Sequence, residues 1–280
     1  MKDTAAPAPG DVTSPAAQWR QPDDADSADV RSGGLVIAVD GPSGSGKSSA
    51  ARGVASALGL RYLDTGAMYR AVTWWLLEHK VDLTDQAAIA GSGLALSIEV
   101  GTDPAVQFTA VNGVEVTGQI RLREVSNAVS QVASVPPVRD HLIAMQRRII
   151  SEAELTAGGI VAEGRDIGTV VAPGAAVKVF LTASEQARAQ RRAAELAGEP
   201  ATSEPARAGS EPSGQLPGAD LTKREQARRD RLDAPQTQRA ADAVEIDATS
   251  LGLAEVIGQI LALAKATSVA QATEAKRASS

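Results

Sequence analysis

Residues 41–48 read Gly-Pro-Ser-Gly-Ser-Gly-Lys-Ser, and this segment carries the clearest chemistry in the chain. Glycines at this spacing let the backbone curl so that successive amide groups bind phosphate oxygens. Lys47 can reach the β- and γ-phosphates of a nucleotide, and the Ser48 hydroxyl can coordinate Mg²⁺. The segment therefore predicts a binding site for a nucleoside triphosphate.

The sequence on either side predicts the two elements that position this loop. An apolar run over 35–39 indicates a buried strand before it, and the helix expected over 47–58 ends at Gly59. The N-terminus of that helix adds the positive end of its dipole to the phosphate site. Strand, loop and helix in this order are the setting in which the motif binds phosphate.

Strand and helix patterns alternate along most of the remaining chain. Asp64-Thr65-Gly66 is a capping signal for a helix at about 67–80, after a short apolar segment over 60–63. The later elements are helices at 121–134 and 137–153, strands at 160–163, 177–181 and 243–247, and helices from about 184 and over 253–265. The alternation predicts a three-layer α/β fold in which helices cover both faces of a central parallel sheet.

Residues 94–118 interrupt this alternation. Short strand patterns occupy 94–100, 106–111 and 114–116. Asn112-Gly113 lies between the last two, and this pair favours a tight hairpin turn. We therefore expect a small antiparallel sheet inserted into the parallel fold.

Two segments have the composition of unfolded chain. Residues 1–32 contain four Pro and six Asp without an apolar period, which predicts a disordered acidic tail. Residues 198–219 contain four Pro, four Gly and three Ser, which predicts a flexible insertion between the arginine-rich segments 188–197 and 221–232. A mobile flap over the phosphates and a linker without a role both fit the insertion. Residues 271–280 are expected to form a C-terminal tail.

Composition excludes several classes of protein. The 280 residues are 43% hydrophobic, enough for a sizeable core, and zero Cys with two His leaves no thiol nucleophile, disulfide or ordinary zinc site. A net charge of −6 with 2% aromatic residues argues against nucleic-acid binding. We find no apolar stretch near the roughly 20 residues that span a membrane, and no signal-peptide pattern. A cytoplasmic monomer without nucleic-acid or membrane partners is expected.

The motifs together resemble a known family. Four segments occur in order: Asp40-Gly41-Pro42-Ser43-Gly44-Ser45-Gly46-Lys47-Ser48-Ser49, Leu63-Asp64-Thr65-Gly66-Ala67-Met68-Tyr69-Arg70, Ser130-Gln131-Val132-Ala133 and Glu163-Gly164-Arg165-Asp166-Ile167-Gly168-Thr169-Val170-Val171. They resemble bacterial cytidylate kinases, P-loop nucleoside monophosphate kinases that phosphorylate CMP and dCMP from ATP. The resemblance covers about 35–263, and its second and fourth segments are far more specific than the phosphate loop. The inserted antiparallel sheet also fits the enlarged monophosphate-binding region of bacterial members.

The resemblance implies substrates, regions and site residues. It implies ATP with Mg²⁺ as donor, CMP or dCMP as acceptor, a kinase core over 33–270, a monophosphate-binding region over 64–150 and a lid over 188–235. It assigns ATP binding to Gly41, Pro42, Ser43, Gly44, Ser45, Gly46, Lys47, Ser48 and Ser49, with Mg²⁺ on Ser48. It assigns acceptor binding to Thr65, Arg70, Ser130, Arg139, Arg165, Asp166, Arg229 and Asp233. Catalytic roles fall to Lys47, Arg165 and Arg229.

Residue chemistry supports the acceptor-phosphate assignments independently. Phosphoryl transfer depends on in-line positioning and on neutralising charge spread over the transferred group. The Thr65 hydroxyl and the guanidinium groups of Arg70 and Arg165 suit a phosphate dianion, because Arg binds phosphate oxygens bidentately. The alternative for Arg70 is a position on a solvated helix face.

The assigned base contacts match the hydrogen-bonding edge of cytosine. Cytosine offers a 4-amino donor beside acceptors at N3 and O2, which suits the Asp166 carboxylate and the Arg139 guanidinium, with Ser130 beside them. Uracil reverses N3 and position 4, and a buried polar site can discriminate such a mismatch by up to about 10⁴–10⁵. An internal Arg165–Asp166 ion pair that shapes the loop is the other interpretation, and it is compatible with base recognition.

The chain departs from the family pattern in the lid. The pattern Arg-Asp-x-x-Asp-x-x-Arg begins at Arg229, but its last position is Gln236, and Arg239 could substitute three residues later. Lid-side arginines of the family match Arg188, Arg191 and Arg192, although an exposed polar helix face also explains them.

Three other functions remain for comparison. Another P-loop small-molecule kinase, with UMP or shikimate as acceptor, would share the fold and donor site and differ at Ser130, Arg139 and Asp166. A GTPase switch needs an Asn-Lys-x-Asp motif, whereas the asparagines here are Asn112 and Asn127 and neither precedes Lys. An arginine-rich RNA-binding module is disfavoured by the net charge and the few aromatic residues.

Overall fold

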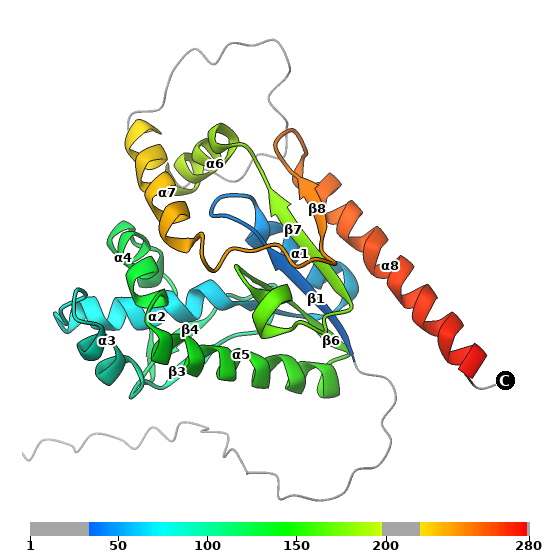
Figure 1. Cartoon of the computed structure of the whole chain (residues 1–280), viewed down its shortest axis with the longest axis horizontal. Coiled ribbons are helices and arrows are strands. Elements are labelled where there is room, and N and C mark those ends of the chain that lie inside the picture. The colour runs from blue at the N-terminus through cyan, green and yellow to red at the C-terminus, as the bar shows by residue number, and fades with distance from the viewer. Residues whose placement is uncertain (1–33, 198–218, 279–280) are drawn as a thin grey trace, which may run out of the picture. The chain divides into compact units, whose positions relative to one another are not determined.

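A parallel five-stranded sheet, in the order β2-β6-β1-β7-β8, carries the fold. Figure 1 labels four of its strands, β6, β1, β7 and β8. The computed structural model describes residues 34–197 and 219–278. The strands of the sheet are β1 (Leu35–Asp40), β2 (Arg61–Asp64), β6 (Gly159–Gly164), β7 (Val177–Thr182) and β8 (Val244–Asp247). The predicted strands are therefore confirmed within one or two residues at their ends.

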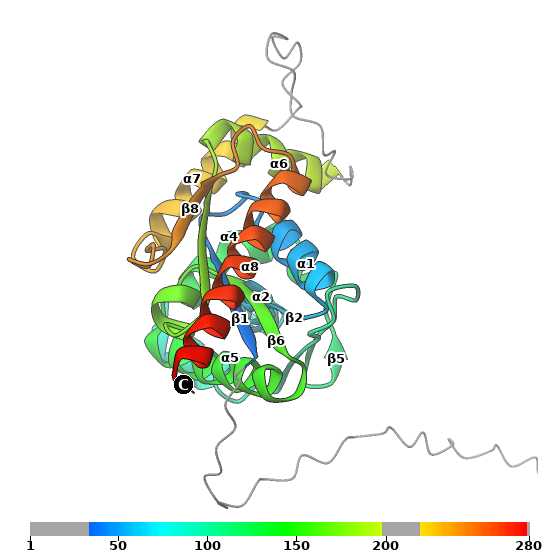
Figure 2. The same cartoon turned by 90° about the vertical axis from the view of Figure 1, so that its right-hand side faces the viewer.

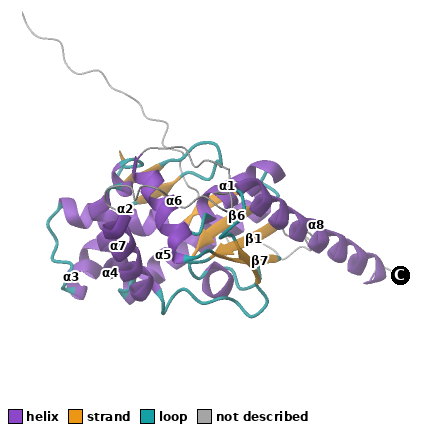
Figure 3. Ribbon diagram, turned by 90° about the horizontal axis from the view of Figure 1, so that it is seen from above, coloured by secondary structure: helices purple, strands orange, loops and turns teal. Residues whose placement is uncertain are grey.

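Helices cover both faces of this sheet, as the sequence predicts. α1 (Lys47–Leu58) and α8 (Leu253–Ala278) lie on one face, and α2 (Thr65–Glu78) and α5 (Pro136–Thr156) lie on the other (Figure 2). Seen from above, β1, β6 and β7 lie side by side between α5 and α8 (Figure 3). The predicted three-layer α/β class is confirmed.

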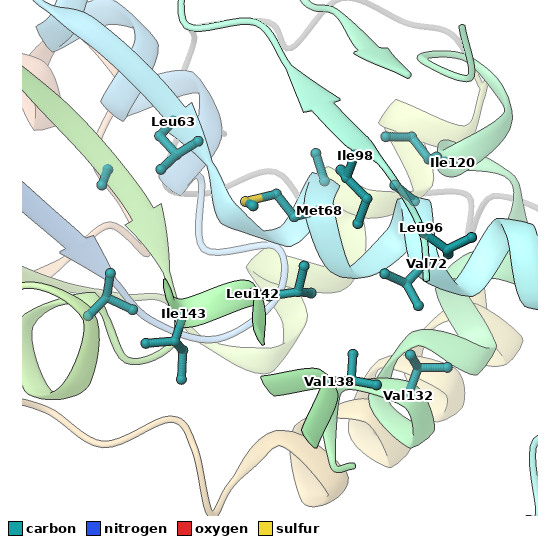
Figure 4. Packing of buried hydrophobic residues seen from close by; sticks show 14 of the residues in the cluster. Leu63, Met68, Val72, Leu96, Ile98, Ile120, Val132, Val138, Leu142 and Ile143 are labelled. Atoms are coloured by element: carbon teal, nitrogen blue, oxygen red, sulfur yellow. The ribbon is translucent and has the colours of Figure 1, made fainter. Parts of the chain in front are cut away.

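The alternating side chains of β1 divide the core into two clusters. Val36 and Ala38 pack with the α2, α4 and α5 side, while Ile37 and Val39 pack with α1 and α8. Strands buried on both faces read as continuous apolar runs, which is why residues 35–39 show no polar alternation. Figure 4 shows larger side chains of the first cluster, among them Met68.

The inserted antiparallel sheet is present but smaller than predicted. Its strands are β3 (Ile98–Val100), β4 (Thr109–Val111) and β5 (Val114–Glu115). Asn112 and Gly113 have φ of 50° and 76°, as a tight hairpin turn of left-handed residues requires. The helix α3 (Gln86–Gly93), capped by Asp85, was missing from the predicted elements. Its short run of Ala and Gly carries no clear apolar period.

The remaining helices surround the carboxyl end of the sheet. They are a 3₁₀ turn at Gln119–Arg121, α4 (Arg123–Ala133), a π-helical turn at Ile167–Val171, α6 (Glu185–Ala197) and α7 (Ala219–Asp233). The predicted acidic tail lies outside the described residues, and so does the predicted insertion except for Ala219, the first residue of α7.

The last helix corrects two expectations. α8 runs to Ala278 instead of ending at 265. Its segment Leu253–Ala270 has a mean hydropathy of 1.4 and is long and apolar enough to cross a membrane, so the expectation that no such stretch exists was wrong. In the first half of α8, however, Val256, Ile260 and Ala264 are buried in the core beside α1. These three residues are the buried 17% of the segment, and one helix of this length and composition does not by itself indicate a membrane protein.

Candidate active site

The loop between β1 and α1 has the backbone that a phosphate site needs. Gly41, Gly44 and Gly46 have φ of 145°, 76° and 97°, values that favour glycine. A Cβ on Gly41 would lie 2.1 Å from the carbonyl oxygen of Leu181 in β7, so no other residue fits there. Lys47 is the first residue of α1, which places the phosphate loop at a helix N-terminus.

Lys47 is buried and points back into its own loop. Its Nζ donates to the carbonyl oxygen of Pro42 at 2.7 Å, and the residue is 6% exposed. Burial and the neighbouring Arg165 lower the pKa of Lys47 to about 7, against the opposing effect of Glu163 and Asp40. A bound polyphosphate would supply the anionic partners that favour the charged amine.

Glu163 is a site residue whose role the sequence reasoning missed. It lies near the carboxyl end of β6, next to β1, and Ser48 Oγ donates to its Oε2 at 3.0 Å. The Tyr62 hydroxyl donates to its Oε1. An acidic residue on the strand beside a phosphate loop is the usual second Mg²⁺ anchor in P-loop enzymes, and this position was the available signal.

The donor set at Ser48 fits Mg²⁺ bound mainly through phosphates. Mg²⁺ prefers oxygen ligands and is usually held by one or two carboxylates together with substrate phosphates and waters. Ser48 and Glu163 supply a hydroxyl and a carboxylate in contact. Among residues 34–197 and 219–278, no three His, Cys, Asp or Glu side chains form a metal cluster by themselves.

One cleft of about 670 Å³ joins the phosphate loop to the predicted acceptor residues. From the donor side it is lined by Ser43, Gly44, Lys47, Ser48 and Ser49. From the acceptor side it is lined by Thr65, Arg70, Ser130, Arg139, Arg165, Asp166, Arg229 and Asp233. The structure therefore brings together every acceptor-side residue named from the sequence, from five separate elements.

The predicted phosphate-binding residues are held at the start of α2. Thr65 Oγ1 donates to the backbone oxygen of Glu163 at 2.7 Å, and Arg70 donates to Asp64 at 2.8 Å. Arg121 also faces Asp64, at 3.9 Å. Although burial alone would raise it, Arg70 and Arg121 hold the pKa of Asp64 below its ordinary value of 3.8. Arg70 therefore lies in the cleft and not on a solvated helix face.

The predicted base-binding residues Arg139 and Ser130 each donate to a carboxylate of the cleft. Arg139 donates to Asp166 at 2.5 Å, and Ser130 donates to Asp233 at 2.7 Å. Arg165 lies 3.3 Å from Asp233 through Nε and donates through Nη1 to the carbonyl oxygen of Gly41. The proposed internal Arg165–Asp166 pair is therefore wrong, because Asp166 pairs with Arg139 instead.

Asp40 fixes the loop that carries Arg165 and Asp166, a role that the sequence reasoning also missed. Its two carboxylate oxygens accept from the amides of Ile167 and Gly168 at 2.8 and 2.7 Å. Burial raises the pKa of Asp40, and these two hydrogen bonds oppose that shift. Because Asp40 directly precedes Gly41, the donor and acceptor loops share one anchor.

The lid-side residues separate into two groups. Gln236 lines the cleft beside Arg229 and Asp233, whereas Arg239 pairs with Glu245 on β8 at 2.9 Å. Arg239 does not take the place of the missing family arginine in this structure.

The arginines of α6 contact the phosphate loop. Arg188 is 7% exposed and donates to Asp230 on α7 and to the carbonyl oxygen of Ser43, so an exposed helix face does not explain it. Arg191 donates to the carbonyl oxygens of Ser45 and Ala248. The side chain of Arg192 lies outside the described residues.

Comparison with known proteins decides the family. The family model described as cytidylate kinase matches residues 37–266. The chain belongs to the cytidylate kinase family. A protein named cytidylate kinase from Streptomyces avermitilis is 43% identical over 235 residues, which cover 82% of this chain and 92% of that protein. One from Rhodococcus jostii is 47% identical over 231 residues, covering 81% and 93% respectively.

Membership confirms the resemblance stated from the motifs. It identifies the chain as a nucleoside monophosphate kinase, a phosphotransferase, and the GTPase and RNA-binding alternatives are no longer favoured. The matched range contains the phosphate loop, the inserted antiparallel sheet and both halves of the lid region.

Proposed function

We propose that this chain transfers the γ-phosphoryl group of ATP to CMP or dCMP, giving CDP or dCDP and ADP. The observation that carries the proposal is the Arg139–Asp166 pair in the same cleft as Lys47. Together these groups offer a donor–acceptor edge for cytosine at one end of a phosphate-transfer site. Relatives named cytidylate kinase support the same acceptor.

On the donor side, the loop 41–49 binds the ATP phosphates. Lys47 neutralises charge on the β- and γ-phosphates, which peaks as the phosphoryl group leaves ADP. Ser48 and Glu163 would hold Mg²⁺, which would neutralise negative charge on the phosphates when bound. Arg188 and Arg191 hold the loop from α6 through its carbonyl oxygens.

On the acceptor side, three groups bind the monophosphate and three bind the base. Thr65, Arg70 and Arg165 hold the phosphate, which needs both neutralisation and orientation toward the donor. Asp166 accepts from the cytosine 4-amino group, Arg139 donates to N3 and O2, and Ser130 supports that edge. Arg229 and Asp233 bind the ribose and the phosphoryl group in transfer.

The organisation proposed around this cleft follows the order of the motifs along the chain. We propose 64–150 as the monophosphate-binding region and 188–235 as a lid within a core over 33–270, in a cytoplasmic monomer. Lids of this kind act by closing over bound substrates. The contacts from α6 and α7 to the phosphate loop and to Ser130 support this division.

A substrate panel tests the function directly. Purified protein with MgATP is assayed by ADP release against CMP, dCMP, UMP, AMP and shikimate. We expect kcat/KM for CMP or dCMP to exceed that for UMP by at least about 10², because uracil presents mismatched groups to Arg139 and Asp166. A preference for UMP or shikimate would contradict the proposal and favour a different P-loop small-molecule kinase.

A further inference from the structure

A chain of hydrogen bonds connects β2 to the phosphate loop through Glu163. Ser48 donates to one carboxylate oxygen of Glu163 at 3.0 Å, and the Tyr62 hydroxyl donates to the other. Each oxygen of this buried carboxylate therefore has its own donor. Glu163 is 3% exposed and Tyr62 is 5% exposed, so water does not compete freely at either end.

The fold fixes both partners of Glu163. β2 pairs in parallel with β6, and Tyr62 lies opposite Val161, two residues before Glu163. The ring of Tyr62 packs in the core cluster with α1, the helix that carries Ser48. A Phe ring would fill the same space, so packing alone does not require the hydroxyl.

The surroundings of Glu163 act in opposite directions on its negative charge. Lys47 stabilises its negative charge, whereas burial and the neighbouring Asp64 oppose it. If the carboxylate turned toward Lys47, it would leave the Ser48 hydroxyl. A hydrogen bond from Tyr62 to Oε1 opposes that rotation and keeps Oε2 at Ser48.

We propose that Tyr62 is a positioning residue for the metal–nucleotide complex: it holds Glu163 so that the Ser48 hydroxyl keeps donating its hydrogen bond to Oε2 and a Ser48 lone pair stays available to Mg²⁺. This inference rests on the proposed donor site, in which Ser48 is a metal ligand. Groups that orient metal ligands from behind typically change metal affinity by about 10–100-fold when removed.

The test measures binding, without the acceptor and without turnover. Isothermal titration calorimetry gives the Kd of ADP with excess MgCl₂ and with EDTA, for the wild type and for Tyr62→Phe. The ratio of the two values reports the metal-dependent part of binding. Thr73→Val is the matched control, because it also removes a buried hydroxyl, which donates to the carbonyl oxygen of Tyr69 on α2 away from the phosphate loop.

We expect Tyr62→Phe to reduce the Mg²⁺ enhancement of ADP binding about tenfold and to leave the Kd in EDTA within about twofold. Thr73→Val should leave the enhancement unchanged. Glu163→Gln should reduce it at least as much as Tyr62→Phe, because it removes the charge itself. Raising free Mg²⁺ should restore ADP binding in Tyr62→Phe.

Several results would overturn the inference. One is a Mg²⁺ enhancement of ADP binding that is unchanged in Tyr62→Phe, and another is an equal loss of this enhancement in Tyr62→Phe and Thr73→Val. A third is an equal loss of ADP affinity with Mg²⁺ and with EDTA, which would indicate that Tyr62 has a purely structural role. A wild type without Mg²⁺ enhancement would also overturn it. Because the panel of acceptors is not used here, these results are distinguishable from failure of the proposed CMP kinase activity.

Discussion

The two halves of the cleft are built differently. The donor half is one continuous loop between β1 and α1, shaped by left-handed glycines and by the helix N-terminus. The acceptor half is assembled from side chains of α2, α4, α5, α7 and the loop after β6. Backbone therefore shapes the first site, while the second consists of polar and charged side chains, most of which pair with one another.

This difference has a consequence for substrate binding. The phosphate loop needs no change of partner to accept phosphate, apart from Lys47, which now donates to Pro42. At the acceptor end, Asp166 is bonded to Arg139, and Asp233 is bonded to Ser130 and Arg165, so the substrate binding proposed above requires these side chains to share or exchange partners. We therefore expect donor-side substitutions to affect all acceptors equally and acceptor-side substitutions to affect them differently.

Lys47→Ala should cause the largest loss of kinase activity, and the loss should be the same for every acceptor. Removing the amine eliminates charge stabilisation that peaks during transfer, about 3–4 kcal/mol or 10²–10³ in rate. The variant should still fold. Burial disfavours the charged amine in the folded protein and lowers the pKa of Lys47 to about 7, so removing the amine should cost little stability. Steady-state ADP release with CMP and UMP, together with a thermal melt, checks both points.

Lys265→Ala, on the exposed surface of α8, is the matched control and should have wild-type activity. Near-normal turnover in a folded Lys47→Ala protein would remove Lys47 from the donor site. A selective loss for one acceptor would contradict the separation of the two halves.

Asp166→Ala should instead change the preference between acceptors. We expect kcat/KM for CMP to fall about 10²-fold or more, and that for UMP to fall much less, because only cytosine presents an amino group to the carboxylate. Asp166→Asn keeps a carbonyl acceptor and should lie between the wild type and Asp166→Ala. The measurement is the ratio of the two specificities, since the freed Arg139 can weaken both substrates.

A CMP/UMP ratio that stays at its wild-type value while both activities fall would make Asp166 a loop-shaping residue. Base recognition would then depend on Ser130 and Arg139. The ADP affinity of the same variant, which depends on residues 41–49, should be unchanged in either case.

The difference between the local donor half and the assembled acceptor half also determined what could be predicted from the sequence. The phosphate loop is local, so its strand, loop and helix were predicted almost to the residue. The acceptor residues came from the family motifs, but their pairings did not, because Ser130 and Asp233 are 103 positions apart. Contacts at that separation are set by the packing of whole elements.

Two further omissions share this cause. Asp40 and Glu163 lie on buried strands, where the sequence shows only a carboxylate next to an apolar run. Their partners come from neighbouring elements. Asp40 accepts from the amides of Ile167 and Gly168, and Glu163 accepts from the hydroxyl of Tyr62. Helix α8 was predicted too short because the sequence of residues 266–278 has no apolar period to mark where the helix ends.

Asp64→Asn should have the smallest of these effects. It should lower the free energy of unfolding, by an amount that depends on pH. Asn still offers an oxygen to the amide of Ala67, so the N-cap of α2 is kept and only the charge is removed. A hydrogen bond to a charged partner contributes about 1.5–3 kcal/mol, so we expect the variant to lose about 1.5 kcal/mol at pH 7. Urea unfolding at several pH values, with the exposed Asp140→Asn as control, measures the loss.

The pH dependence follows from the lowered pKa of Asp64. In the unfolded chain the carboxyl has its ordinary value of 3.8, and in the folded chain Arg70 and Arg121 hold it lower. Its contribution is therefore complete well above 3.8 and is lost as the pH falls through the folded value. The difference in unfolding free energy between the wild type and Asp64→Asn should therefore shrink below about pH 4. A difference that stays constant from pH 7 downward would mean that the charge of Asp64 does not contribute and that Arg70 is positioned without it.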